Sequence, residues 1–325
     1  MKIGIVTPAP PGSLYGNRVT ALRWARILRR LSHRVNLKQK YEGEEFDLLI
    51  ALHARRSHAA IRAFHREHPQ APIIVALTGT DVYHDIRSGE DARESLRLAT
   101  RLIVLQPKAI AELPAPERAK ARVIYQSVER KPRPGNKRSR VAGNVRARRN
   151  FDVCVIGHLR PVKDPLRAAM AARLLPVSSR VRILQVGGAM SAAMAARARR
   201  EARINPRYRW LREQSPARVR EILACSQLCL LSSKIEGGAN VLGEAIVAGV
   251  PVLASQIAGS VGILGESYPG YFEAGDTPGL ARLLLRAESD ARFRDRLAAC
   301  CHQLAPLFAP SKEREAWTAL LKELS

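Results

Sequence analysis

The sequence predicts an α/β protein made of two doubly wound domains, and three observations lead to this. Short runs of Val, Ile and Leu alternate with longer amphipathic segments, which is typical of buried parallel strands separated by helices. The alternation occurs in two blocks, before and after a basic stretch at 130–149. The chain has 325 residues, enough for two domains that each bury a core.

The expected elements follow from the local patterns. Strands are expected at 2–6, 46–52, 73–77, 101–105 and 122–125 in the first block, and at 151–156, 181–186, 227–231 and 251–254 in the second. Helices are expected at 16–31, 191–203, 216–224 and 277–288. The expected domains are 1–129 and 151–307, joined by a linker at 130–150, with a last helix at 308–325 that packs back on the first domain.

The composition is strongly basic. Lys and Arg number 54 against 29 Asp and Glu, a formal net charge of +25, and nine of these basic residues lie at 130–149. Such a charge favours an anionic partner, whether a phosphate compound, a nucleic acid or an acidic membrane surface. The five cysteines lack the spacing of a disulfide framework or a zinc site. We therefore expect reduced thiols and a cytoplasmic protein.

Two kinds of segment are excluded by pattern. The apolar start of the chain ends at Thr7-Pro8, too early for a signal peptide. An uncharged stretch at 245–265 has the length of a membrane span, but its glycines and proline predict a helix end, a turn, a buried strand and a loop.

Nucleotide-binding motifs of the common kinds are absent from the sequence. No two glycines stand two positions apart, which argues against an NAD or FAD site. The nearest match to a P-loop, from Gly238 to Gly243, continues with Glu244 where Lys is required. We therefore exclude an ordinary dinucleotide enzyme and an NTPase.

The most informative stretch reads Glu-Gly-Gly-Ala-Asn-Val-Leu-Gly-Glu, from Glu236 to Glu244. The two glycines open a helix whose first N–H groups can bind an anion. Glu236 precedes this helix and Glu244 lies within it, and each carboxylate can accept hydrogen bonds from sugar hydroxyls. The stretch therefore offers contacts for hydroxyls at both ends and for a phosphate between them.

A second polar stretch follows the first strand of the second block. It reads Gly-His-Leu-Arg-Pro-Val-Lys from Gly157, which places Arg160 and Lys163 where ligands bind in such sheets. Two cations there can stabilise the negative charge of a departing diphosphate. The chain contains no Asp-x-Asp, so we expect neither a metal ion nor another cofactor.

Together these stretches resemble the Glu-x7-Glu and Gly-x-Leu motifs of GT-B glycosyltransferases of the GT4 type. The resemblance implies two Rossmann-like domains that face a central cleft, and metal-independent sugar transfer. It implies catalytic roles for Arg160, Lys163 and Glu236, with Glu236 on the donor sugar and Glu244 on the ribose. The donor-binding residues that it implies are Gly12, Gly16, Asn17, Gly157, Gly237, Gly238, Ala239, Asn240, Val241 and Glu244.

By the same resemblance the first domain holds the acceptor. A Pro- and Gly-rich loop follows the first strand, and the runs His-Ala-Arg-Arg and Thr-Gly-Thr-Asp follow two others. Thr78 stands where many family members have His. The expected acceptor-binding residues are Arg18, His53, Arg55, Arg56, Thr78, Gly79 and Thr80.

Five motifs are similar to one bacterial subfamily, the selenosugar synthases of selenoneine biosynthesis. They are Pro-Ala-Pro-Pro-Gly-Ser, Ala-Leu-His-Ala-Arg-Arg-Ser, Ala-Leu-Thr-Gly-Thr-Asp, Gly-His-Leu-Arg-Pro-Val-Lys-Asp-Pro and Glu-Gly-Gly-Ala-Asn-Val. This resemblance implies transfer of a sugar from UDP-N-acetylglucosamine or UDP-glucose to selenophosphate, an anion that carries its own nucleophile.

Two alternatives stay open. One is a GT4-type enzyme that acts on a lipid or glycan hydroxyl, and the other is a basic nucleic-acid-binding protein. We expect neither a nucleic-acid partner nor stable membrane insertion. Few aromatic residues flank the basic stretch, and no helix joins a basic face to an aromatic apolar face.

Overall fold

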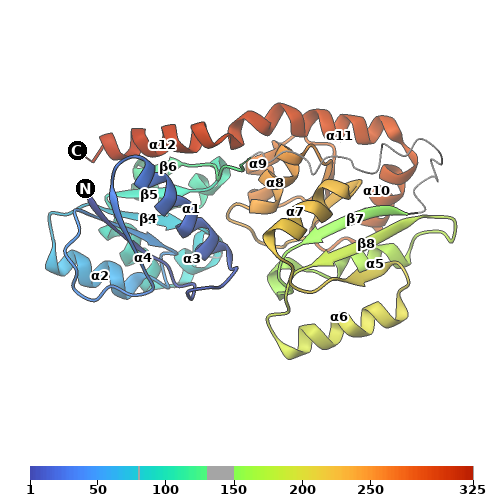
Figure 1. Cartoon of the computed structure of the whole chain (residues 1–325), viewed down its shortest axis with the longest axis horizontal. Helices are drawn as coiled ribbons and strands as arrows, with labels where there is room; N and C mark the ends of the chain where they lie inside the picture. Colours follow the sequence, from blue (N-terminus) through green and yellow to red (C-terminus); the bar gives the residue numbers. More distant parts are fainter. Residues whose placement is uncertain (80, 130–149, 325) are drawn as a thin grey trace. The chain divides into compact units, whose positions relative to one another are not determined.

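The computed structural model describes residues 1–79, 81–129 and 150–324, which form two compact units. Unit 1 comprises Met1–Ser127, Glu236–Asn240 and Ala309–Ser325, and unit 2 comprises Val128–Ile235 and Val241–Phe308. Each unit is a parallel sheet covered by helices (Figure 1). The predicted pair of doubly wound α/β domains is confirmed. The expected linker at 130–149 lies outside the described residues.

The sheet of unit 1 has the strand order β2-β1-β3-β4-β5-β6. Its strands are β1 (Lys2–Val6), β2 (Arg34–Lys38), β3 (Leu48–Leu52), β4 (Ile73–Leu77), β5 (Arg101–Val104) and β6 (Ala121–Val123). Its helices are α1 (Gly16–Arg30), α2 (His58–Glu67), α3 (Ile86–Ser88), α4 (Glu90–Leu98) and α12 (Pro310–Lys322). Because β1 lies between β2 and β3, the winding reverses there, and the loops after β1 and β3 meet at the carboxyl edge of the sheet.

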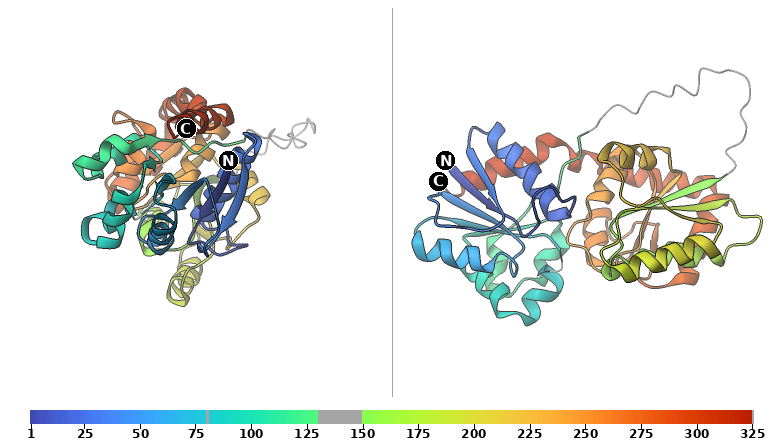
Figure 2. Two further views of the ribbon diagram at one scale, coloured as in Figure 1. Left: turned by 90° about the vertical axis from the view of Figure 1, so that its left-hand side faces the viewer. Right: turned by 60° about the horizontal axis from the view of Figure 1, so that its bottom comes forward.

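The sheet of unit 2 has the order β12-β11-β10-β7-β8-β9 and reverses its winding in the same way, between β10 and β7. Its strands are β7 (Phe151–Ile156), β8 (Val181–Val186), β9 (Tyr208–Trp210), β10 (Leu228–Leu231), β11 (Val252–Ser255) and β12 (Tyr271–Phe272). Its helices are α5 (Arg167–Arg173), α6 (Ala192–Ile204), α7 (Pro216–Cys225), α8 (Asn240–Ala248), α9 (Ala258–Leu264), α10 (Thr277–Ser289) and α11 (Ala291–Leu304). Figure 2 shows these helices on both faces of the sheet.

Several helices of unit 2 begin at a side chain that caps the first turn. Ser191 accepts a hydrogen bond from the Met194 amide at 3.2 Å, and so begins α6. Asp290 accepts one from the Phe293 amide at 2.9 Å, and so begins α11. A cap satisfies an amide that has no partner within the helix, so these residues explain where the helices start.

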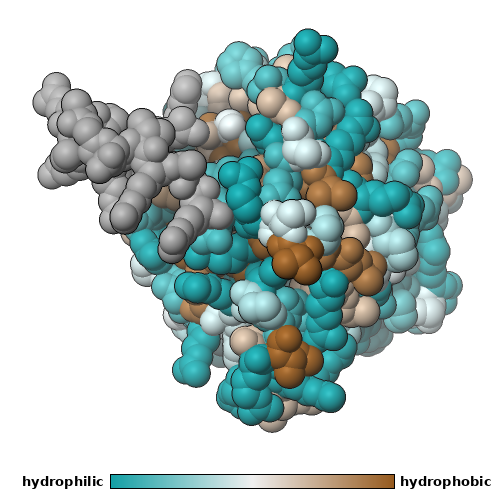
Figure 3. Space-filling model, turned by 90° about the vertical axis from the view of Figure 1, so that its right-hand side faces the viewer, coloured by the Kyte–Doolittle hydropathy of each residue, from teal (hydrophilic) through white to brown (hydrophobic). Residues whose placement is uncertain are grey.

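None of the helices formed by the described residues has both the length and the apolar character needed to cross a bilayer. The uncharged stretch at 245–265 is divided among the end of α8, β11 and α9. The face drawn in Figure 3 is largely hydrophilic, with apolar side chains in small groups between polar ones.

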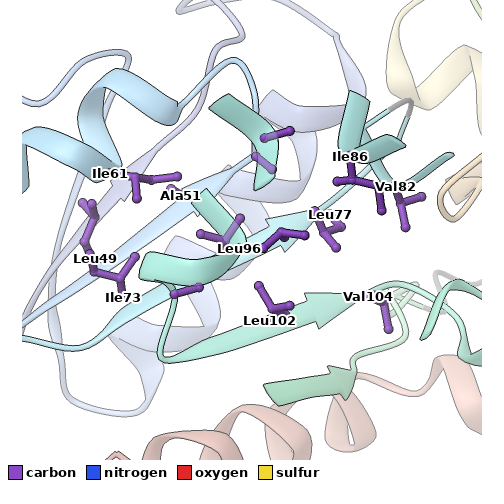
Figure 4. Close-up of a cluster of buried hydrophobic side chains, with 14 of the residues drawn as sticks. Leu49, Ala51, Ile61, Ile73, Leu77, Val82, Ile86, Leu96, Leu102 and Val104 are labelled. Carbon is purple, nitrogen blue, oxygen red and sulfur yellow. The ribbon is translucent and has the colours of Figure 1, made fainter. Parts of the chain in front are cut away.

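Unit 1 buries both faces of its sheet, as β3 illustrates. Leu49 and Ala51 belong to a core that includes residues of α2 and α4 (Figure 4). Leu48, Ile50 and Leu52 belong to a second core, which includes residues of α1 and α12. Successive side chains of a strand point to opposite faces, so a strand buried on both faces must be apolar throughout.

Some elements were not predicted. The sequence analysis missed β2, an edge strand in which polar residues alternate with apolar ones, and β12, which has only two residues. It placed a strand at 122–125 where β6 covers Ala121–Val123. It also missed α2, α3, α4, α11 and α5, the last of which has four buried alanines that give no strong apolar period. The stretch after β11 that was predicted as a loop forms helix α9.

Candidate active site

At the carboxyl edge of the unit 2 sheet, the loop after β7 carries the two basic residues expected to bind a diphosphate. Arg160 and Lys163 bracket a short turn, in which the Lys163 amide donates to the Arg160 carbonyl oxygen at 3.0 Å. Gly157 begins this loop, and its amide donates to the Val186 carbonyl oxygen at 2.8 Å. Arg160 and Lys163 are both partly exposed, so an anion can reach them.

The loop after β10 runs beside this turn. The Ser232 hydroxyl donates to the carbonyl oxygens of Lys163 and Asp164, at 3.2 and 2.9 Å. The Lys234 amide donates to the Val162 carbonyl oxygen at 2.8 Å. Because β7 and β10 are neighbouring strands, their two loops are held together at one edge of the sheet.

The two motif glutamates have different surroundings. Glu244 lies in α8 and is half-buried. Glu236 precedes this helix, is only 8% exposed, and belongs to unit 1 by its contacts. Gly237, Gly238 and Ala239 lead into the helix, whose first residues are Asn240 and Val241. The two carboxylates therefore leave the chain at different points.

Within unit 1, the two glycines of the motif lie against the ends of β4 and β5. A Cβ atom on Gly237 would stand 2.7 Å from the Thr78 carbonyl carbon and 2.8 Å from the Gly79 nitrogen. A Cβ atom on Gly238 would stand 2.4 Å from Cβ of Leu105. Only glycine permits such an approach without a backbone shift. The structure thus brings expected donor residues beside expected acceptor residues.

His53 follows β3 and is a buried residue, only 4% exposed, in the left-handed backbone region with φ of 75°. Its Nδ1 accepts a hydrogen bond from the Arg56 amide at 3.4 Å, so the neutral ring carries its proton on Nε2. Nε2 lies 3.7 Å from Oδ2 of Asp85. Burial lowers the pKa of His53 and outweighs the attraction of Asp81 and Asp85.

The two arginines after His53 remain accessible. Arg55 Nε contacts Oδ2 of Asp85 at 3.0 Å, while 48% of the Arg55 side chain stays exposed. Arg56 is exposed as well. Burial tends to raise the pKa of Asp85, but hydrogen bonds from Arg55 and His84 lower it overall. A charged carboxylate thus orients Arg55 at the edge of the sheet.

Asp81 joins the loops after β3 and β4. Its carboxylate is fully buried and accepts hydrogen bonds from the amides of Gly79, Thr78 and Ala54, at 2.8, 3.4 and 3.2 Å. One side chain therefore sets the backbone that follows both strands. The sequence analysis assigned Asp81 no role, although an Asp two residues after a loop glycine is a signal for such a turn. Thr80, an expected acceptor residue, lies outside the described residues.

The loop after β1 reaches the same edge, because β1 is paired with β3. Gly12 and Gly16 are exposed, and Asn17 is half-buried in the first turn of α1. Arg18 follows, and its Nε is buried without a hydrogen-bond partner among the described residues. A buried guanidinium nitrogen gains from an acceptor, so an anionic ligand suits this position.

Two further side chains were not predicted: Arg23 contacts the motif, and Tyr83 contacts Gln106. Arg23 Nη2 of α1 donates to Oδ1 of Asn240 at 3.1 Å. Tyr83 accepts a hydrogen bond from Gln106 Nε2 at 2.8 Å, just after the end of β5. Arg23 is 217 positions from its partner, and no local pattern distinguishes it from the other arginines of α1.

Two cysteines of unit 2 lie in the strands that lead into these loops. Cys154 and Cys229 are paired across β7 and β10, and both are fully buried. A hydrogen bond with Cys154, together with burial, raises the pKa of Cys229. Among the described residues, no group of three or more His, Cys, Asp and Glu side chains is arranged to hold a metal ion.

Comparison with known proteins gives a family match over part of the chain. The family model described as "Glycosyl transferases group 1" matches residues 139–299. A search of curated proteins found no match.

Solved structures resemble the whole chain. Anabaena HepE in complex with UDP is 16% identical, with a TM-score of 0.77 and 99% of this chain and 100% of that chain covered. Sucrose-phosphate synthase from Thermosynechococcus elongatus is 16% identical, with a TM-score of 0.76 and coverage of 99% and 98%. A structure described as trehalose-6-phosphate from E. coli bound with UDP-2-fluoro glucose is 11% identical, with a TM-score of 0.72 and coverage of 100% and 99%. At such identities the likeness establishes the fold.

Proposed function

We propose that this chain, which has the GT-B fold and matches the family model of glycosyl transferases group 1 over residues 139–299, is a glycosyltransferase that moves a sugar from a UDP-sugar to selenophosphate. The product is a 1-seleno sugar, for selenoneine biosynthesis. The donor is UDP-glucose or UDP-N-acetylglucosamine. Two structural neighbours support the choice of nucleotide, because HepE has been crystallised with UDP-glucose and the E. coli protein with UDP-2-fluoro glucose.

The donor is assigned to the loops of the 236–244 motif and to the loop after β7. Glu244 accepts from the ribose hydroxyls and Glu236 from the hydroxyls of the sugar. The diphosphate lies near Arg160 and Lys163, which are partly exposed at the carboxyl edge of the unit 2 sheet. Their charges stabilise the diphosphate as it leaves, so the reaction needs no metal ion.

The acceptor is assigned to the carboxyl edge of unit 1. The observation that carries this assignment is the state of His53, which is buried, has a lowered pKa, and uses Nδ1 to accept a hydrogen bond from the Arg56 amide. Such a histidine is a poor base for removing the proton of a hydroxyl acceptor. Exposed Arg55 and Arg56 beside it instead suit a small anion. Selenophosphate meets both conditions, because its selenium attacks without prior loss of a proton.

The proposed reaction has two steps. Selenium attacks the anomeric carbon of the sugar, the bond from that carbon to the UDP oxygen breaks, and UDP leaves with the electron pair. Water then cleaves the Se–P bond, which releases phosphate and leaves the 1-seleno sugar. Arg160 and Lys163 take part in the first step, and Arg18, Arg55 and Arg56 hold the phosphate end of the acceptor.

Purified protein incubated with UDP-glucose or UDP-N-acetylglucosamine tests the proposal. Three reactions run in parallel, with selenophosphate, with a lipid or glycan alcohol, and with no acceptor. UDP release and the mass of the sugar product are measured. Formation of a 1-seleno sugar supports the proposal, whereas a glycosylated alcohol supports the alternative acceptor. Absence of UDP binding, combined with tight binding of RNA or DNA, supports the nucleic-acid alternative.

A further inference from the structure

A pair of polar residues in unit 1, Tyr83 and Gln106, has no role in the function proposed above. Gln106 follows β5 directly and is 0% exposed. Its Nε2 donates to the Tyr83 hydroxyl oxygen at 2.8 Å, and its Oε1 is buried without a hydrogen-bond partner among the described residues. Tyr83 lies in a single turn of π-helix, Asp81–Asp85, and its ring packs on the core beneath α2 and α4. The Tyr83 side chain is thus held by the hydrogen bond at its hydroxyl group and by the packing of its ring.

The residues that follow Glu236 contact the loops that carry Tyr83 and Gln106. Gly237, the next residue, touches the backbone of Thr78 and Gly79, and Gly79 accepts a hydrogen bond from the amide of Val82 at 3.3 Å. Gly238 touches Leu105, the neighbour of Gln106 in sequence. The chain around Glu236 is therefore pressed against the two loops that carry Tyr83 and Gln106.

The electrostatic setting suits a hydrogen-bond donor. Burial raises the pKa of Tyr83, and the carboxylates of Glu112 and Glu236 raise it further, so the phenol keeps its proton at any pH at which the enzyme works. Its oxygen already accepts from Gln106, which leaves the O–H group to donate. Glu236 is almost buried, and a buried carboxylate is stable only with such donors.

We propose that Tyr83, held by Gln106, is a positioning residue that orients the Glu236 carboxylate toward the donor sugar. This rests on the proposed contact of Glu236 with that sugar. A directed hydrogen bond to one carboxylate oxygen limits the rotation of the side chain. The expected effect is on sugar transfer and not on binding of the nucleotide.

A double-mutant cycle tests this. The variants are Tyr83→Phe, Glu236→Gln and the two combined. Tyr41→Phe is the matched control, because Tyr41 also lies in unit 1 and donates to a glutamate, Glu67, at 2.8 Å. UDP affinity is measured by calorimetry, and kcat by UDP release from UDP-glucose with selenophosphate and with water alone. Thermal melting reports whether each variant is folded.

Loss of one hydrogen bond to a charged group is expected to lower kcat by about 10-fold in Tyr83→Phe. UDP affinity is expected to stay within about 2-fold, and Tyr41→Phe to match the wild type. In the Glu236→Gln background, Tyr83→Phe is expected to have no further effect, because the pair acts as a unit. A second variant, Gln106→Leu, is expected to reproduce the loss of kcat by freeing the phenol.

Three results would overturn the inference: an unchanged kcat in Tyr83→Phe, an equal loss in both backgrounds, or a loss of UDP affinity as large as the loss of kcat. Release of UDP from UDP-glucose with water alone measures the effect of each variant on kcat even if selenophosphate is not the acceptor. A wild-type protein that neither binds UDP nor releases it from UDP-glucose would instead refute the proposed function, and the inference with it.

Discussion

The indole nitrogen of Trp24 in α1 donates a 2.9 Å hydrogen bond to Glu313 in α12, a residue 289 positions later in the chain. The other carboxylate oxygen of Glu313 accepts from both the amide and the hydroxyl of Ser127. Glu313 is only 1% exposed, and the rings of Trp24 and Trp317 meet edge-on with centroids 5.1 Å apart. One buried carboxylate therefore joins the last helix of the chain to unit 1.

We expect Glu313→Leu to lower the free energy of unfolding by about 3 kcal/mol, because it leaves three buried donors without an acceptor. Urea unfolding followed by tryptophan fluorescence measures the change. Glu315→Leu is the control on the same helix, where Glu315 is exposed and pairs with Lys312 at 2.8 Å. Its cost is expected to stay below about 1 kcal/mol. Equal losses in the two variants would show that the buried carboxylate has no special role.

The two motif glutamates are expected to differ in what they bind. Glu244→Ala is expected to weaken UDP binding by about 10-fold or more, because the ribose loses a charge-assisted hydrogen bond. Glu236→Ala is expected to leave UDP affinity nearly unchanged and to lower kcat for the UDP-sugar. Calorimetry with UDP alone, beside steady-state kinetics, separates them. Unchanged UDP affinity in Glu244→Ala would remove the ribose assignment.

The basic residues after β7 are expected to act on the leaving group. Arg160→Ala and Lys163→Ala should each lower kcat by about 100-fold and change the donor KM much less, because the diphosphate gains charge only as it leaves. A chelator is expected to have little effect on the wild type. Strict dependence of turnover on Mg²⁺ or Mn²⁺ would contradict this account.

Arginines at the edge of unit 1 are expected to bind the acceptor. Arg56→Ala and Arg55→Ala should raise the selenophosphate KM by about 10-fold, since each removes a charge-assisted hydrogen bond. The donor KM should stay near that of the wild type. Arg66→Ala is the control, because Arg66 is 77% exposed on α2 and pairs only with its neighbour Glu67 among the described ion pairs. A similar rise in KM for Arg66→Ala would point to the general positive field rather than to a site.

The buried His53 makes stability depend on pH. Its pKa is lowered in the folded protein from the ordinary value of 6.5, so below that pH the unfolded chain binds a proton that the folded chain does not. The free energy of unfolding is therefore expected to fall as the pH drops from about 6.5 through the folded pKa. His53→Asn, which tolerates the left-handed backbone, should reduce this dependence. His65→Asn, at a partly exposed position of α2, should keep it. Urea titrations from neutral to mildly acidic pH measure the slopes, and equal slopes in both variants would contradict the prediction.

Local patterns were enough to predict the architecture. A strand such as β3 is buried on both faces, so it must consist of apolar residues, and this makes it visible in the sequence. The edge strand β2 carries Arg34, Asn36 and Lys38, so only two apolar residues, Val35 and Leu37, distinguish this short strand from a surface loop. The 236–244 motif was visible for a different reason. Its two glutamates lie in one short stretch of the chain, so their spacing can be recognised in the sequence.

The surroundings of the motif were decided by the tertiary structure alone. Gly237 and Gly238 lie against residues that follow β4 and β5 and precede the two glycines by more than a hundred positions in the sequence. Tyr83 meets Gln106, and Trp24 meets Glu313, through bonds that form only when distant loops reach the same place. The free energy that brings such residues together comes from burial of the whole core and not from the residues themselves. For this reason a single sequence predicts which residues have the right chemistry, and only the folded chain decides which of them meet.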